Sequence, residues 1–269
     1  MRFRPTALLV LALALCGCGK SHPTTPAPPT GTTTDFANAV MASYPSGAVI
    51  PTTLSTSGCL LAGVDVAGFG AAIALFNNGS AFVDAGRVHL DGSRASPWTS
   101  IDSLARRSVS VAGTPYYYYS SIPNLPDLTP LVWDGGHYQV WHVSGHGSIP
   151  AIDDSVLSVS EPAVTAPAAS ANVPRNADLS ITWSDAGSDT TVYVLCSLRA
   201  DADTSHAAVS TLVRDTDGAA TIPTGRLTPL PAGNARLSTA RFRLVRHTVG
   251  ATAVQLLCEA VELRNITLQ

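Results

Sequence analysis

The chain has 269 residues and a net charge of −3, and 13% of its residues are charged, against about 25% in an average globular protein. Lys20 is its sole lysine. This charge balance excludes the strong electrostatic attraction on which nucleic-acid binding rests. Gly, Pro, Ser and Thr are abundant between short apolar segments, which is typical of a turn-rich, extracytoplasmic β protein and excludes a mainly helical fold.

The first residues have the pattern of an export signal. Arg2 and Arg4 precede an apolar run at 7–15. That run is too short to cross a bilayer of about 30 Å as a helix, and it fits the h-region of a secretory signal.

The next four residues, Leu15-Cys16-Gly17-Cys18, resemble the lipobox of bacterial lipoproteins, although Ala or Ser is more usual than Cys16 at its position. The resemblance implies that 1–17 is a signal peptide removed before Cys18, which then carries lipid. It places the protein on a membrane, most readily the outer membrane of a Gram-negative bacterium, facing the periplasm or the cell surface. The alternative is a plain secretory signal with two incidental cysteines.

A tether and a β-rich domain follow. Residues 18–34 are rich in Pro and Thr and have no apolar periodicity, so we predict a disordered linker. Residues 35–157 form the predicted N-terminal β-rich domain, and 35–44 is either a short helix or a strand. We expect a second short helix at 100–107 and strands at 59–66, 71–76, 86–90, 108–111, 116–120 and 138–143.

Residues 158–269 are predicted to form a small C-terminal β-sandwich. Leu179, Ile181 and Trp183 alternate with polar residues, and an acidic turn and another strand follow. This order resembles the immunoglobulin-like modules of bacterial surface proteins, which implies an immunoglobulin-like fold for this domain. Further strands are expected at 191–198, 207–213, 219–222, 235–245 and 253–263. The predicted fold class is therefore all-β, with two β-sandwich-like domains.

Three cysteines lie outside the signal region: Cys59, Cys196 and Cys258. Cys196 and Cys258 both lie in strand-like runs of the C-terminal region, and pairing them would close a loop of about 60 residues, worth ~4 kcal/mol in the chain-entropy model. Trp183 precedes both, so this disulfide would differ from that of antibody domains. The alternative is that all three are small, buried, apolar residues.

Two clusters are candidates for function. Tyr117, Tyr119, Trp133 and Trp141 lie in an aromatic-rich segment at 116–141, which as an exposed platform would stack on sugars. A histidine cluster in the same region, His137, His142 and His146, offers metal ligands, but no carboxylate is spaced to complete a site. Ordinary strand packing is the alternative for both.

No catalytic motif is present: the sequence lacks G-x-S-x-G, H-E-x-x-H and a Walker loop. We therefore predict a lipid-anchored envelope protein of structural or binding role, without enzymatic activity, cofactor or metal. Its partners would be the membrane, through the lipid, and a polysaccharide or an envelope protein, with no nucleic acid. A carbohydrate-binding or adhesion module is the first alternative, and a metal-dependent hydrolase built on the three histidines is the second.

Overall fold

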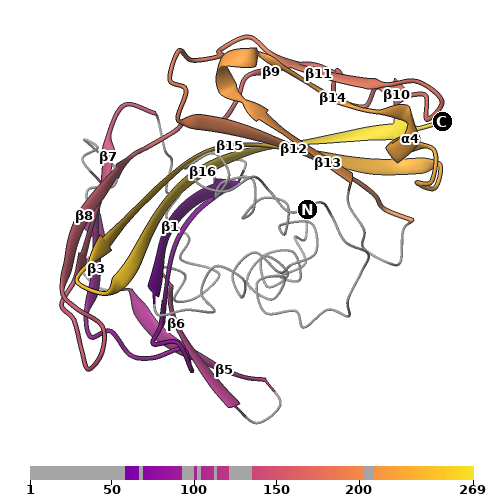
Figure 1. The fold of residues 1–269 in the computed structure, drawn as a ribbon. Coiled ribbons are helices and arrows are strands. Elements are labelled where there is room, and N and C mark those ends of the chain that lie inside the picture. The colour runs from indigo at the N-terminus through magenta and orange to yellow at the C-terminus, as the bar shows by residue number, and fades with distance from the viewer. Residues whose placement is uncertain are drawn as a thin grey trace. The chain divides into compact units, whose positions relative to one another are not determined.

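The computed structural model describes residues 58–66, 69–92, 100–101, 104–111, 114–120, 135–202 and 209–269. The predicted signal peptide, Cys18, the tether and Trp133 lie outside the described residues. The described chain is almost wholly β, as predicted (Figure 1), and its helical elements there are the 3-10 turn η3 (Asp215–Asp217) and the single turn α4 (Thr224–Leu227). No helix of this part of the chain has both the length and the apolar character needed to cross a membrane.

The chain divides into two compact units that are discontinuous in sequence. The N-terminal unit holds Leu54–Glu161 and Phe242–Val261, and the C-terminal unit includes Pro162–Arg241 and Glu262–Gln269. The sequence-based division placed its one boundary between the two β regions at 157/158. It did not anticipate that a segment near the C-terminus would belong with the first β region.

The C-terminal unit is a two-layered sandwich. Its strands are β9 (Val164–Ala166), β10 (Asn172–Val173), β11 (Leu179–Trp183), β12 (Val192–Ala200), β13 (Val209–Arg214), β14 (Ala219–Ile222) and parts of β15 (Gly233–Val249) and β16 (Thr252–Leu268). One layer has the order β14-β11-β9, and the other has β13-β12-β15-β16 with β10 parallel to β16. If the two-residue β10 is left out of the count, the first, second and fifth strands of this unit form one layer and the third, fourth, sixth and seventh form the other. This arrangement is immunoglobulin-like, except that the fourth strand lies in the second layer.

The core of this sandwich confirms the predicted alternation of β11. Leu179, Ile181 and Trp183 are all buried, and the residues between them are not. They pack in one apolar cluster with Val194 and Cys196 of β12. The inward face of one layer therefore meets that of the other, which is how a sandwich buries its apolar side chains.

The N-terminal unit also has two sheets. Its strands are β1 (Gly58–Val66), β2 (Phe69–Asn77), β3 (Val88–Gly92), β4 (Ser100–Ile101), β5 (Ala105–Val111), β6 (Thr114–Ser120), β7 (Tyr138–Val143), β8 (Ile152–Leu157) and the remaining parts of β15 and β16. One sheet has the order β15-β16-β1-β2-β6-β5, and the other has the order β4-β3-β7-β8. Gln139 of β7 reaches the first sheet, where its amide donates to the Cys258 sulfur at 2.9 Å. Gly63 admits this close approach, because a Cβ there would lie 2.4 Å from the Gln139 Oε1.

The prediction of a helix at 100–107 is wrong. Residues Ser100–Ile101 form β4, which pairs with β3, and residues from Ala105 onward form β5. Strand β5 runs antiparallel along the tyrosine-rich β6. Pairing with a strand later in the sequence thus decides the conformation here, over a weak local preference for helix.

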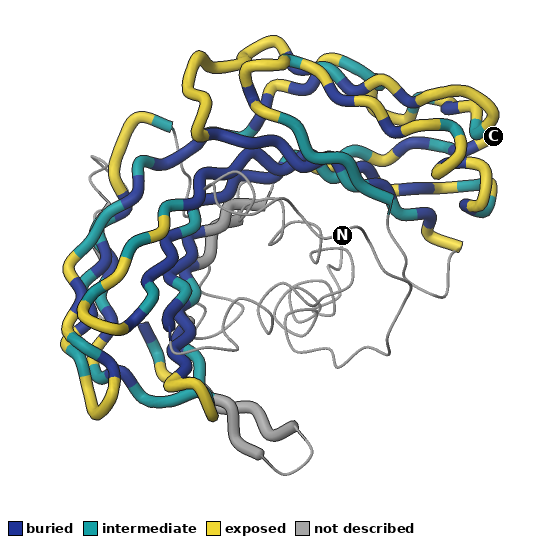
Figure 2. Tube along the Cα trace, viewed as in Figure 1, coloured by how far each residue is buried: buried dark blue, intermediate teal, exposed yellow. Residues whose placement is uncertain are grey.

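The sheet β4-β3-β7-β8 has one apolar and one polar face, and this positions the candidate site. Val88, Leu90, Trp141 and Val143 are buried, and they alternate along β3 and β7 with more exposed residues. Figure 2 shows buried and partly exposed positions alternating along these strands. An antiparallel sheet with one face on the core leaves its other face to water.

Candidate functional site

Four polar side chains meet on the outer face of this sheet. His89 and Asp91 are two residues apart on β3, and because side chains alternate along a strand they share a face. The ladder between β3 and β7 sets His89 directly opposite His142, and the ladder between β7 and β8 sets His142 opposite Asp153. Residues directly opposite in an antiparallel pair lie on the same face. Three adjacent strands therefore bring together two imidazoles and two carboxylates.

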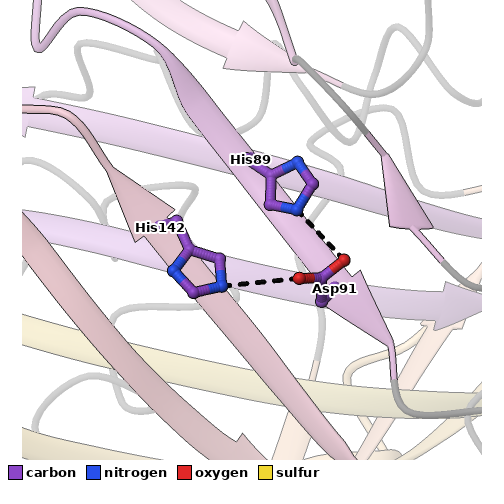
Figure 3. Close-up of side chains that lie close together, drawn as sticks. All are labelled: His89, Asp91 and His142. Atoms are coloured by element: carbon purple, nitrogen blue, oxygen red, sulfur yellow. Dashed lines mark ion pairs between the residues drawn. The ribbon is translucent and has the colours of Figure 1, made fainter.

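Both imidazoles point toward the carboxylate of Asp91 (Figure 3). The His89 Nε2 lies 3.0 Å from Asp91 Oδ1, and the His142 Nε2 lies 3.4 Å from Asp91 Oδ2. The two rings are tilted by 42°, with centroids 5.4 Å apart. On its other side His142 has Nδ1 2.6 Å from Asp153 Oδ1. Asp91 thus lies between the two rings, and Asp153 contacts the ring of His142 through its other nitrogen.

The cluster is open to solvent. The exposed fraction is 23% for the side chain of His89, about 42% for those of Asp91 and His142, and 79% for that of Asp153. Among the described residues, His89, Asp91 and His142 form the one group of three or more His, Cys, Asp or Glu whose ligand atoms all lie within 4.8 Å of one another. Two nitrogen donors and one oxygen donor are a ligand set suited to a divalent transition metal.

Sequence reasoning identified only His142 of this cluster. His137 and His146 are exposed, and neither belongs to the metal-ligand group. His146 lies in the tight connection after β7, where its backbone pairs with Ile149. Neither His89 nor Asp91 is among the candidate residues from the sequence. The available signal was the pair His89-x-Asp91 on a strand, but its meaning depends on the pairing of β3 with β7.

The prediction of an exposed aromatic platform is wrong for Tyr119 and Trp141, because both side chains are buried. Trp141 is fully buried on the inner face of its sheet, and Tyr119 is 2% exposed. Tyr119 packs edge-on against Phe76. Tyr117 is half-buried under the Arg106 guanidinium, 5.6 Å from the ring centroid. Tyr119 is therefore a core residue of β6, which is the ordinary strand packing given above as the alternative.

A partly buried network of hydrogen bonds surrounds Tyr119. Its hydroxyl donates to Asp84 Oδ1 at 2.5 Å and accepts the Ala85 N–H at 3.0 Å. The hydrogen bond from Tyr119 lowers the pKa of Asp84, and Arg106, which pairs with the same carboxylate, acts in the same direction. Burial raises the pKa of Tyr119 to about 12. This ring therefore supports the fold and is not available to stack on a ligand.

The predicted disulfide is not formed. Cys59, Cys196 and Cys258 are all buried, and none of them forms a disulfide. The structure therefore follows the alternative, in which each packs as a small apolar residue. Burial raises the pKa values of Cys59 and Cys196 to about 12.

A second charged group lies in the C-terminal unit. Arg241 donates to Asp215 from Nε at 3.0 Å and to Asp185 from a terminal nitrogen at 2.8 Å. Burial alone would raise the pKa of Asp185, but the hydrogen bonds and the charge of Arg241 lower it. Asp215 also accepts the Gly187 N–H, and its carbonyl accepts the indole N–H of Trp183. These contacts tie the turn after β11 to η3 and β15, which is a structural role.

Comparisons with known proteins assign no family to this chain. No protein-family model matches the chain, and no curated protein matches it. Among solved structures, the chain is similar to the FN1–FN3 domains of chicken CNTN1, at 9% identity and a TM-score of 0.23. That alignment covers 74% of this chain and 62% of the chicken chain, so this chain spans less than two thirds of its length.

Proposed function

We propose that this chain is an exported protein of the cell envelope, anchored to a membrane by lipid on Cys18, with a structural or binding role and no enzymatic activity. The observation that carries the proposal is the Leu15–Cys18 run directly after a short apolar segment. A lipidated cysteine with several acyl chains anchors a protein stably, since each buried methylene contributes about 0.8 kcal/mol. The outer membrane is the proposed location, with the domains facing the periplasm or the cell surface.

In the folded part, the polar networks have structural roles, which supports the proposal. Arg241 and its two aspartates hold turns together, and the hydroxyl of Tyr119 fixes the segment around Asp84. All-β sandwiches of this kind present loops and sheet faces on a rigid frame, which suits a structural or binding module. The partners that this role implies are the membrane, through the lipid, and an envelope polysaccharide or protein.

Metabolic labelling with radioactive palmitate tests the anchor. The wild-type chain, expressed in a Gram-negative host, should incorporate label and sediment with the outer membrane. Cys18→Ser should lose the label and no longer sediment with the outer membrane. Cys16→Ser is the matched control, two residues away in the same segment, and should keep both label and location. Loss of label in Cys16→Ser with retention in Cys18→Ser, or no label in the wild type, would refute the proposal.

A further inference from the structure

We propose that His89, Asp91 and His142 form a binding site for a zinc ion on the outer face of the sheet β4-β3-β7-β8. The site would supply two imidazole nitrogens and one carboxylate oxygen, and water would fill the remaining coordination positions. This inference is independent of the lipid anchor, because it rests on the described part of the N-terminal unit alone.

The donor spacing fits a zinc ion. Zinc binds nitrogen and oxygen ligands at about 2.0–2.1 Å with tetrahedral geometry, so neighbouring donors lie about 3.3 Å apart. The two histidine-to-Asp91 separations are 3.0 and 3.4 Å, and all three ligand atoms lie within 4.8 Å of one another. Both rings are partly exposed, so they can rotate to direct all three donors at one ion.

Asp153 gives His142 the orientation that a ligand needs. A neutral imidazole carries one N–H, and here Nδ1 faces the Asp153 carboxylate at 2.6 Å. A proton on Nδ1 leaves a lone pair on Nε2, which points at the Asp91 carboxylate 3.4 Å away. A histidine held by a carboxylate on one nitrogen and bound to metal by the other is the usual arrangement at zinc sites.

The frame of the site is rigid although the ligands are exposed. The β3 and β7 ladder fixes His89 opposite His142, and Leu90 and Trp141, adjacent on the same strands, are fully buried beneath them. Three protein ligands with open positions resemble the ligand number of exchangeable or catalytic zinc sites more than that of closed structural ones. Imidazole nitrogen favours zinc over calcium or magnesium, which prefer oxygen ligands.

Calorimetric titration with zinc chloride tests the site. The full chain would carry Cys16→Ser and Cys18→Ser in every sample, so that the N-terminal thiols contribute nothing. The parent should bind one zinc ion per chain through this site, and neither calcium nor magnesium should displace it. His89→Gln and His142→Gln should each weaken binding by at least ~100-fold, and Asp153→Asn by roughly 10- to 100-fold, the range for outer-shell partners.

His146→Gln is the matched control, because this histidine is exposed, lies in the same unit and is outside the ligand group. It should leave the affinity unchanged. Thermal melting by circular dichroism without metal should give similar curves for all variants, since none of the substituted side chains belongs to the buried core. In the parent, cobalt in place of zinc should give visible absorption bands, which His142→Gln should abolish. Absence of zinc binding in the parent, or equal affinities for His142→Gln and His146→Gln, would overturn the proposal.

Discussion

Glu259 of β16 is a carboxyl group buried in the N-terminal unit. It is 3% exposed, and its Oε1 has no hydrogen-bond partner in the part of the chain that the structure describes. Burial raises the pKa of Glu259 from 4.5 to about 7. Replacing it by Gln keeps the shape and removes the charge, so Glu259→Gln should stabilise the protein above neutral pH.

The size and the sign of the effect follow from linkage. Below pH 4.5 the group is neutral in both the folded and the unfolded chain and costs nothing. As the pH rises from 4.5 to about 7, the unfolded chain loses the proton first, and the free energy of unfolding falls. Above pH 7 the loss of unfolding free energy is complete. It amounts to ~3 kcal/mol, because the pKa differs between 4.5 in the unfolded chain and about 7 in the folded one, and each tenfold change in the ionisation constant is worth about 1.4 kcal/mol.

Urea denaturation of both proteins at pH 4.5, 6 and 8.5 measures this difference. Glu259→Gln should unfold at nearly the same urea concentration as wild type at pH 4.5 and at a higher one at pH 8.5. Glu262→Gln is the control: it lies on the same strand, but its carboxylate is paired with Arg264 at 2.7 Å. A stability difference between wild type and Glu259→Gln that does not change with pH would refute the reasoning.

Two other substitutions probe the polar networks around Arg241 and Tyr119. Arg241→Met leaves the Asp215 carboxylate buried without its cation, so urea denaturation should show a loss of about 3–5 kcal/mol; the exposed Arg246→Met should lose far less, and equal losses would contradict the structural role. Tyr119→Phe removes the hydrogen bond that lowers the pKa of Asp84, so an NMR titration of that carboxyl should show its pKa rising toward 3.8. Because a lowered pKa stabilises above 3.8 and loses that effect as the pH falls, the variant should also lose less stability on acidification; an unchanged titration would contradict this.

The elements that sequence alone predicted well are those with strong local patterns. The alternation of Leu179, Ile181 and Trp183 needs no partner strand to be recognised, and the structure buries all three. The segment at 100–107 has no such pattern, and its conformation depends on pairing with β3 and β6. Local propensity could not reveal a partner that lies elsewhere in the chain.

The zinc-site residues illustrate the same limit. His89 and His142 are 53 positions apart, and they become neighbours only through the register of β3 and β7. A shift of that register by one residue would move His142 out of line with His89. Spacing along the chain therefore favoured the three histidines at 137, 142 and 146, two of which lie outside the cluster. A site assembled across strands has no signature in a single segment.

The buried thiols allow the opening of each unit to be measured separately. With a pKa of about 12, only on the order of one Cys59 or Cys196 side chain in a hundred thousand is thiolate at neutral pH. Alkylating reagents attack the thiolate, so both sulfurs should react only when the surrounding strands open. Cys59 belongs to the N-terminal unit and Cys196 to the C-terminal one. Alkylation followed by mass spectrometry would therefore measure the opening rate of each unit, in a protein that carries no substitution.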